Sequence, residues 1–366
     1  MDGPRTGPLA DLRVIDCSTL IAAPGCARYL ADFGADVVKV ERPNGGDSIR
    51  GLGWRDPRDG ETLWSKLENR NKRCITLDLK SAEGQARFLD LCADTDVLIE
   101  NFRTGTLERL GFGPDVLHAR NPRLVITRVS GFGQDGPYAG RPGFATLAEA
   151  MSGFASVNGE PDGAPLLPPI ALADDVTALV AAFATMVAVH SGVGQVVDVS
   201  LLDSMLQIMG PLPMLWATLG QLQPRLGAGL PYSVPRNTFR CRDDRWVAIS
   251  TSSEPIAARV MALVGLAGDP RVATSADRAA HRDLVDRAVA EWISTRDFDE
   301  VLAAFHEADA AIAAVMTMAD LAADPHVLAR QSLVEVDGVL MQNVVARLSR
   351  TPGRLRWAGR PLGADD

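Results

Sequence analysis

The fold is decided by residues 12–41, LRVIDCSTLIAAPGCARYLADFGADVVKVE. The run LRVIDCS predicts a strand, PGCARYLADFGA predicts a helix that begins at Pro24 and ends at Gly34, and DVVKVE predicts a second strand. A strand, a helix and a strand in this order indicate a βαβ unit, in which the two strands lie parallel in one sheet.

The same alternation continues to about residue 205. Further strands are expected in residues 73–80, 96–101 and 123–131 and within 191–206. Ser81 is expected to cap a helix over residues 82–94, and short helices are expected in 104–111 and 114–121. The sequence therefore predicts an α/β protein with a mostly parallel sheet that helices cover on both faces.

The first strand-to-helix turn, IDCSTLIAAPGC, has no GxGxxG pattern. In dinucleotide-binding folds these glycines let the backbone approach a pyrophosphate at this turn. The sequence therefore argues against a standard NAD site.

A stretch that contains proline and glycine, residues 219–235, is predicted to be a domain boundary. Beyond it, NTFRCRD and RWVAIS alternate like paired strands joined at Asp243 and Asp244, and the chain to about residue 320 is mainly helical. We expect a large domain over residues 1–220 and a smaller α+β domain over residues 225–325. Residues 332–366 are irregular and resemble a tail laid over a surface.

The composition argues against several classes of protein. A net charge of −9 disfavours a general nucleic-acid binder, which needs a basic face to replace the counterions around phosphates. The N-terminus lacks a basic region followed by a long apolar segment, and no later run has the roughly 18 uninterrupted apolar residues of a membrane helix. We therefore expect a cytoplasmic protein without a membrane partner.

The cysteines indicate neither a disulfide framework nor a zinc site, because they are odd in number, scattered and without CxxC spacing. They are expected to be reduced and mostly buried, and no metal site is predicted. The five are Cys17, Cys26, Cys74, Cys92 and Cys241.

Residues 69–80, NRNKRCITLDLK, form a basic cluster inside this acidic protein, with Arg70, Lys72, Arg73 and Lys80 against a single acid. Such a cluster could hold an anionic ligand. Any one Lys or Arg is more often a solvated surface charge, so both interpretations stay open.

Two carboxylates, Asp174 and Asp175, stand at the start of the nearly apolar run PIALADDVTALVAAFATMVAVH, residues 169–190. Aspartate commonly caps a helix N-terminus. The unpaired amides and the dipole at a helix start also favour an ionised acid, which suits a nucleophile. The pattern alone leaves open whether these residues are a cap or a catalyst.

Six strings in order carry a resemblance to a known family: LIAAPGCARYLADFGADVVKVERPNGGDSIR, NRNKRCITLDLKSAEG, VLIENFRTGTLERLGF, VSGFGQDGPYAGRPGF, AMSGFASVNGEPDGAP and GQVVDVSLLDSML. Each resembles the matching segment of the family III CoA-transferases, which include formyl-CoA and carnitine CoA-transferases and are related to the α-methylacyl-CoA racemases. The resemblance implies a Rossmann-like large domain completed by residues 330–366, a small domain, and a homodimer of two interlocked chains.

The resemblance implies a role for Asp174, which falls on the position of the family's aspartate nucleophile. That carboxylate attacks an acyl-CoA thioester, and CoA then forms an aspartyl-CoA thioester that a second acid receives. Asp174 is expected to stay ionised, and Asp175 is left as the helix cap. The implied substrates are an acyl-CoA thioester and a free carboxylic acid, with no prosthetic group.

An α-methylacyl-CoA racemase is the alternative enzyme class. The catalytic histidine of the racemases falls at Phe144, which cannot exchange a proton, although Glu254 stands where they carry a catalytic glutamate. Ile21 and Phe144 also replace a glutamine and a tyrosine of the formyl-CoA transferases, which predicts a more apolar pocket. The transferase is favoured, and a non-catalytic acyl-CoA-binding paralogue is a third hypothesis.

The resemblance also implies the CoA site. Arg42, Lys80, Asn101 and Arg109 fall on CoA-contacting positions, and Leu77 falls on the adenine side. Arginine suits phosphate because its planar fork donates two parallel hydrogen bonds.

Overall fold

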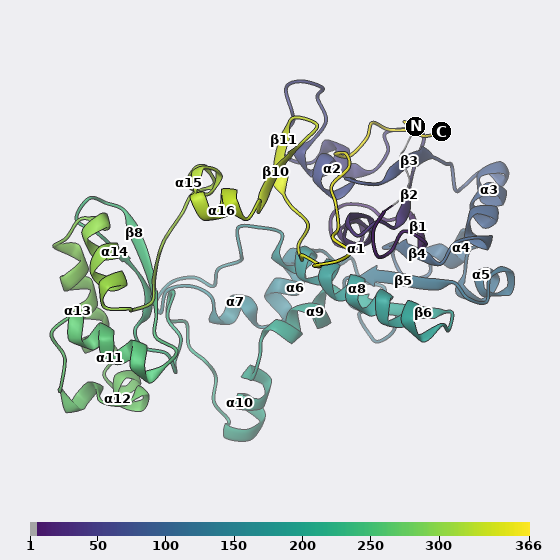
Figure 1. The fold of residues 1–366 in the computed structure, drawn as a ribbon. Helices are drawn as coiled ribbons and strands as arrows, with labels where there is room; N and C mark the ends of the chain where they lie inside the picture. The colour runs from purple at the N-terminus through teal and green to yellow at the C-terminus, as the bar shows by residue number, and fades with distance from the viewer. Residues whose placement is uncertain (1–5) are drawn as a thin grey trace. The chain divides into compact units, whose positions relative to one another are not determined.

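The computed structural model describes residues 6–366, and the chain divides into two compact units (Figure 1). The large unit contains the residues up to Phe154, together with Leu167–Gly210 and Pro325–Asp366. The small unit contains Ala155–Leu166 and Pro211–Asp324. The domain limits expected from the sequence, 1–220 with 330–366 and 225–325, stay predictions.

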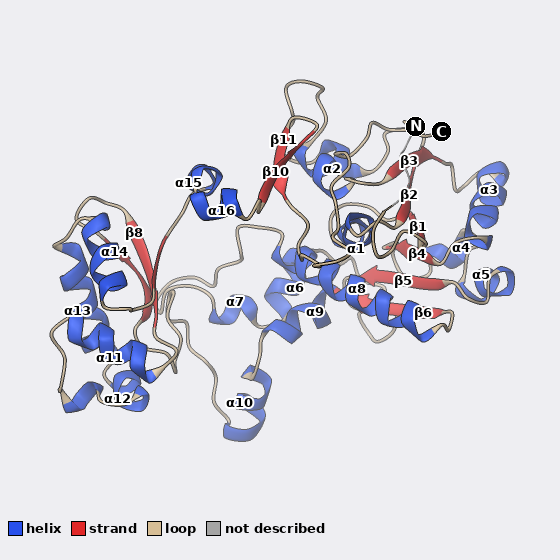
Figure 2. Ribbon diagram, viewed as in Figure 1, coloured by secondary structure: helices blue, strands red, loops and turns tan. Residues whose placement is uncertain are grey.

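The large unit is built on a six-stranded parallel sheet, which confirms the predicted α/β class (Figure 2). The strand order is β3-β2-β1-β4-β5-β6. The chain adds β2 and β3 on one side of β1 and β4, β5 and β6 on its other side, so the order reverses between β1 and β4. This is the strand order of dinucleotide-binding folds, whose ligands lie at the carboxyl edge near that reversal. The strands are β1 (Arg13–Asp16), β2 (Asp36–Glu41), β3 (Arg73–Thr76), β4 (Val97–Glu100), β5 (Val125–Ser130) and β6 (Gln195–Ser200).

Helices cover both faces of this sheet because successive strand residues point to opposite sides. Val14 belongs to an apolar cluster with residues of α1 and α8, and Ile15 belongs to a second cluster with Phe88 of α3 and Leu117 of α5. The large-unit helices up to α9 are α1 (Ala22–Asp32), α2 (Leu63–Glu68), α3 (Ala82–Ala93), α4 (Thr106–Arg109), α5 (Pro114–Arg120), α6 (Ala145–Met151), α8 (Leu172–Ser191) and α9 (Leu201–Ile208), with the 3₁₀ helix η1 (Ser48–Gly51).

Local signals in the sequence predict two helix starts, at Ser81 and at Pro24. The Ser81 hydroxyl accepts a hydrogen bond from the Gly84 amide at 3.0 Å, which confirms the predicted N-cap of α3. The predicted start of α1 at Pro24 is wrong, because the helix begins at Ala22. Proline fits the first turn of a helix, where its missing N–H would have had no intrahelical partner.

Helix α8 is long and apolar enough to cross a membrane by length and composition, which the two aspartates in its first turn obscured in the sequence. One third of that window, 33%, is buried inside the protein. The buried residues Ala173, Ala181 and Ala188 belong to the apolar cluster that also contains residues of α1 and the sheet.

The small unit combines a three-stranded antiparallel sheet with helices around an apolar cluster that includes Val247, Val285 and Phe305. Phe239 pairs with Val247, which confirms the predicted strand pair, and Asp244 takes a positive φ of 68° in the turn between them. The strands are β7 (Arg236–Arg240), β8 (Trp246–Ser250) and β9 (Ile312–Ala314); the helices are α7 (Phe154–Val157, at the unit boundary), α10 (Leu212–Leu219), α11 (Glu254–Leu263), η2 (Pro270–Val272), α12 (Ser275–Ala280), α13 (Arg282–Ser294), α14 (Phe298–Glu307) and α15 (Met318–Ala323).

The C-terminal segment is less irregular than the sequence suggested. After α16 (Pro325–Ala329), the strands β10 (Leu333–Val336) and β11 (Val339–Gln342) form an antiparallel hairpin. Asp337 and Gly338 join them with φ values of 51° and 73°. An Asp-Gly pair with both φ angles positive is a strong hairpin signal. The irregular tail predicted over residues 332–366 is therefore wrong for residues 333–342.

Asn71 anchors the remaining tail to the large unit. Its side-chain amide donates to Asp32 Oδ1 at 2.9 Å and to the Arg354 carbonyl at 3.0 Å, and its Oδ1 accepts from the Arg356 amide at 2.7 Å. Asn71 is 1% exposed and has a φ of 62°, a left-handed conformation that asparagine tolerates better than most residues. The residue therefore suits the site through both its side chain and its backbone.

Replacing Asn71 with Ala should lower the free energy of unfolding by about 3 kcal/mol, since the three hydrogen bonds of its side chain, at about 1 kcal/mol each, are lost. Asn71→Gly should lose about 1 kcal/mol less, because glycine adopts a positive φ without strain. Urea denaturation of both variants measures the difference. A loss below about 1 kcal/mol in both would show that the tail is not anchored here.

Candidate active site

Two cavities lie along the carboxyl edge of the sheet in the large unit. Cavity I, of about 540 Å³, is lined by residues 17–19, 40–44, 46–47 and 77–80 and by Phe102, Thr106 and Leu110. Cavity II, of about 420 Å³, is lined by residues 19–22, 129–131 and 142–146 and by Leu52, Asn101, Arg103, Asp174 and Leu201. Thr19 lines both cavities, so the loop after β1 lies between them.

Asp174 is the carboxylate of cavity II: of the described residues that line this cavity, no other is acidic. It lies in the first turn of α8, whose N-cap is Ala171. Glu149 of α6 accepts a hydrogen bond from the Ala173 amide at 3.2 Å and so occupies the place of a capping side chain. The predicted cap by Asp175 is wrong, because α8 begins at Leu172 and Asp175 already donates its own amide to the Ala171 carbonyl.

Burial and, after it, the carboxylates of Asp175, Glu149 and Glu68 together raise the pKa of Asp174 to about 7. The predicted constant ionisation of Asp174 is therefore wrong near neutral pH. Burial and three like charges outweigh the helix N-terminus, whose dipole effect is small by comparison. Asp174 titrates in the range in which a carboxyl can act both as an ion and as a neutral acid.

Behind Asp174, charged side chains of α1 and α2 compensate one another only in part. Arg28 is ion-paired with Glu68, with Nε and Oε2 3.2 Å apart. Burial raises the pKa of Glu68 and of Asp175, and Arg28 opposes both shifts. Arg28 is thus shared between Glu68 and Asp175, and burial together with the neighbouring carboxylates makes the Asp174 charge costly.

The structure brings Ile21, Phe144 and Asp174 together at cavity II. Phe144 is 60% exposed and is the N-cap residue of α6, where it places an aromatic ring rather than a titratable group at the cavity. Glu254 belongs to the small unit, where it accepts hydrogen bonds from the Ser275 amide and from Arg278, both at 2.9 Å. These contacts give Glu254 a structural role between α11 and α12.

The residues predicted to contact CoA divide between the two cavities. Arg42, Leu77 and Lys80 line cavity I. Arg109 donates to the hydroxyl of Thr106, another residue of this cavity, at 2.6 Å. Asn101 lines cavity II instead, and its side chain is bonded to the backbone of Thr19.

Two cations of the basic cluster of residues 69–80 are not available to a phosphate. Arg70 is buried against Asp32 with an Nη2–Oδ2 distance of 2.5 Å, and Lys72 is buried against Asp16 with an Nζ–Oδ2 distance of 2.8 Å. Arg73 pairs with Asp36 at 3.0 Å. The hypothesis that these cations hold an anionic ligand is wrong for Arg70 and Lys72, because both are buried against an internal carboxylate. For the partly exposed Arg73 it stays a prediction.

Sequence reasoning missed Glu149 and Arg103. Glu149 lies in a helix remote in sequence from α8, and no local pattern marks its contact with the Ala173 amide. Arg103 follows Asn101 by two residues at the carboxyl end of β4, where parallel strands gather ligand-binding side chains. That position was a usable signal for Arg103.

No group of three or more His, Cys, Asp or Glu side chains within residues 6–366 is arranged to hold a metal ion. All five cysteines are free and buried, as the sequence predicted. Burial raises the pKa of the Cys17 thiol, the one cysteine that lines cavity I, well above its usual value.

Arg42 and Lys80 at the wall of cavity I and Asp174 at the wall of cavity II lie along the carboxyl edge of one parallel sheet. This arrangement is typical of α/β enzymes that place a nucleotide-like ligand next to a reactive acid. Comparison with known proteins narrows this class. The family model described as CoA-transferase family III matches residues 9–366, so the chain belongs to the family III CoA-transferases. It is a transferase that acts on a CoA thioester.

Relatives over nearly the whole chain agree. The chain is 39% identical to the succinyl-CoA–D-citramalate CoA-transferase of Chloroflexus aurantiacus, over 97% of this chain and 91% of the relative. It is 41% identical to the beta subunit of the succinyl-CoA–L-malate CoA-transferase of the same organism, over 99% and 93%. A CaiB/BaiF family protein from Brucella suis has a similar structure, with a TM-score of 0.87 at 30% identity over 98% of this chain and 97% of that one.

Replacing Asp174 with Asn should stabilise the folded protein above pH 7 and not below pH 4. A carboxyl whose pKa rises from 3.8 to about 7 on folding loses up to about 4 kcal/mol of relative stability as the pH passes upward through that window. Urea denaturation across this pH range measures the difference between D174N and the wild type. An equal difference at both ends would contradict the raised pKa.

Proposed function

We propose that this chain moves CoA from an acyl-CoA thioester to a free carboxylic acid through an aspartyl-CoA thioester on Asp174. The observation that carries the proposal is the position of Asp174, the one carboxylate among the described residues that line cavity II. Membership of the family supports the general reaction, and the match of Asp174 to the family's nucleophile supports the residue.

In the first half-reaction an Asp174 oxygen attacks the thioester carbonyl carbon. The C–S bond breaks, which leaves a mixed anhydride and the CoA thiolate. The thiolate then attacks the Asp174 carbonyl carbon and releases the donor acid, and the product is the aspartyl-CoA thioester. The acceptor acid repeats both steps in reverse and restores the Asp174 carboxylate, so two easier exchanges replace one difficult one.

Cavity I supplies what the CoA moiety requires. Arg42 and Lys80 are exposed cations at its wall, suited to phosphate groups, and Leu77 offers an apolar surface to the adenine. Arg109 would add a cation beside Thr106. The thioester end of the ligand would then pass the loop at Thr19, which borders cavity II and Asp174.

For the acceptor we propose a small dicarboxylic acid. The two Chloroflexus relatives are named for transfer from succinyl-CoA to D-citramalate and to L-malate. In this chain, Arg103 is the one cation among the described residues that line cavity II, and its guanidinium makes no hydrogen bond or ion pair with any residue in 6–366. An exposed arginine beside the nucleophile suits a second carboxylate.

The racemase alternative is less well supported. Phe144 lies at cavity II and cannot exchange a proton, and Glu254 is engaged with Arg278 in the small unit. The hypothesis of a non-catalytic acyl-CoA-binding paralogue makes a different prediction, namely CoA binding without turnover.

We further propose that the chain forms the interlocked homodimer that the family resemblance implies, and that it is cytoplasmic. Leu179, Phe183 and Val187 lie four residues apart on α8 and are 45%, 72% and 54% exposed. Such a stripe on an otherwise packed helix suits the surface of a second chain.

Replacing Asp174 with Ala should abolish transfer and leave CoA binding nearly unchanged. The matched control Asp175→Ala should keep the transfer rate within about tenfold of the wild type, as expected for the loss of a neighbouring charge. Mass spectrometry of the products, after incubation in deuterated water with acyl-CoAs and free acids, measures this. Deuterium at the α-carbon of an unchanged 2-methylacyl-CoA would point to racemisation. Full transfer by D174A would refute the nucleophile.

Replacing Arg103 with Gln should raise the KM for a dicarboxylate acceptor about tenfold or more, because a charged hydrogen bond to the second carboxylate is lost. The KM for a monocarboxylate acceptor of similar size should change little. Steady-state kinetics with both acids tests this. An equal rise for both acids would indicate that Arg103 holds the CoA moiety instead.

A further inference from the structure

The loop after β1 is the wall shared by the two cavities. Its residue Thr19 lines both of them, and Leu20 and Ile21 line cavity II beside Asp174. Leu20 has a φ of 67°, in the left-handed region that is disfavoured for residues with a Cβ. A loop in this conformation persists only where its surroundings hold it in place.

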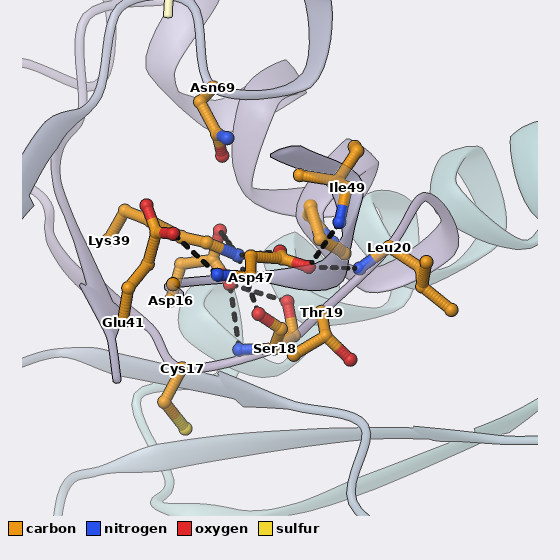
Figure 3. Close-up of polar contacts among 12 residues, drawn as sticks. Asp16, Cys17, Ser18, Thr19, Leu20, Lys39, Glu41, Asp47, Ile49 and Asn69 are labelled. Carbon is orange, nitrogen blue, oxygen red and sulfur yellow. Dashed lines mark hydrogen bonds and ion pairs between the residues drawn. The ribbon is translucent and has the colours of Figure 1, made fainter. Parts of the chain in front are cut away.

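Three side chains from other strands and loops hold the backbone of this loop, and Figure 3 shows two of them, Lys39 and Asp47. Lys39 donates to the Ser18 carbonyl at 2.5 Å. The Asn101 amide bonds both the Thr19 amide, at 2.9 Å, and the Thr19 carbonyl, at 2.7 Å. Asp47 Oδ1 accepts from the Leu20 amide at 3.0 Å, which is the contact at the strained residue itself.

Asp47 is itself rigidly placed. It is 2% exposed, and its Oδ1 also accepts from the Ile49 amide at 3.0 Å, which caps η1. Its Oδ2 lies 3.0 Å from Nζ of the fully buried Lys39, and its own amide donates to Glu41 Oε2 at 2.7 Å. A carboxylate held at both oxygens offers the Leu20 amide a fixed acceptor.

Lys39 connects Asp47 to the end of β1. Its Nζ lies 3.6 Å from Asp16 Oδ2, and Asp16 in turn accepts from Lys72 at 2.8 Å and from the Ser18 amide at 3.0 Å. The two buried lysines and two buried aspartates balance in charge, so the network is stable only when complete. The loop is therefore fixed from the strand end as well as from Asp47.

We propose that Asp47 is a positioning residue for the transfer reaction. By holding Leu20 in its left-handed conformation, Asp47 fixes the wall between the cavities, and this wall sets the place of the thioester relative to Asp174. The inference rests on the proposed function of the two cavities. Asp47 lines cavity I and bonds a residue of cavity II, so it is the contact through which one cavity determines the shape of the other.

The experiment compares D47A and D47N in the full-length chain. Asn keeps an oxygen acceptor at this place, whereas Ala removes it. Asp56→Asn is the matched control, because Asp56 is a buried carboxylate of the same unit that pairs with Lys66 at 2.6 Å and lines neither cavity. The readouts are kcat and KM for the acyl-CoA, the Kd of CoA, and hydrogen exchange of a peptide that contains Leu20.

In D47A we expect at least tenfold faster exchange of the Leu20 peptide and at least a tenfold fall in kcat. KM and the Kd of CoA should change by about threefold or less, because misplacing a reacting group lowers the rate more than it weakens binding. D47N should lie between D47A and the wild type in both exchange and kcat. D56N should keep the wild-type kcat.

An unchanged kcat or an unchanged Leu20 exchange in D47A would overturn the proposal. So would a parallel loss of kcat in D56N, which would reveal a general effect of stability. If D47A does not fold, hydrogen exchange of the wild type tests the proposal. Its Leu20 amide must then be as well protected as the Ile49 amide, which donates to the same oxygen of Asp47. Absence of transfer in the wild type would overturn the proposed function, which a defect confined to D47A would not.

Discussion

The structure depends on a charge-balanced network buried under the carboxyl edge of the sheet. Lys39 and Lys72, both essentially inaccessible to solvent, are neutralised by Asp16 and Asp47. Removing one partner would leave an uncompensated buried charge, which costs about 3–5 kcal/mol. Because Lys39 and Asp47 also bond the backbone after β1, the network that stabilises the large unit is the same one that shapes both cavities.

Burial and neighbouring charges also explain the pKa of Asp174. Its position at a helix start would favour the ion, but its burial and, after that, the carboxylates of Asp175, Glu149 and Glu68 raise its pKa to about 7. A carboxyl with this pKa is a better nucleophile once ionised than one held strongly acidic. The stability that the fold loses by burying Asp174 is consistent with a reactive site, where proteins commonly store such strain.

Local sequence patterns predicted the structural features that depend on residues close together in the chain. The βαβ unit of residues 12–41, the Ser81 cap and the pairing of β7 with β8 followed from periodicity and capping rules. The internal partners of Arg70 and Lys72 did not, because Asp32 and Asp16 lie on other elements and no spacing marks them. For the site, the resemblance supplied Asp174 and the CoA positions, whereas the pKa of Asp174 and its neighbour Glu149 required the assembled fold.

The most direct test of the account is to trap the covalent intermediate. The wild-type chain is incubated with an acyl-CoA and then treated with hydroxylamine, which converts a carboxyl thioester or anhydride into a stable hydroxamate. Peptide mass spectrometry then locates the modification. A hydroxamate is expected on Asp174, formed only when the acyl-CoA is present. A hydroxamate on another residue, or none in a protein that transfers CoA, would contradict it.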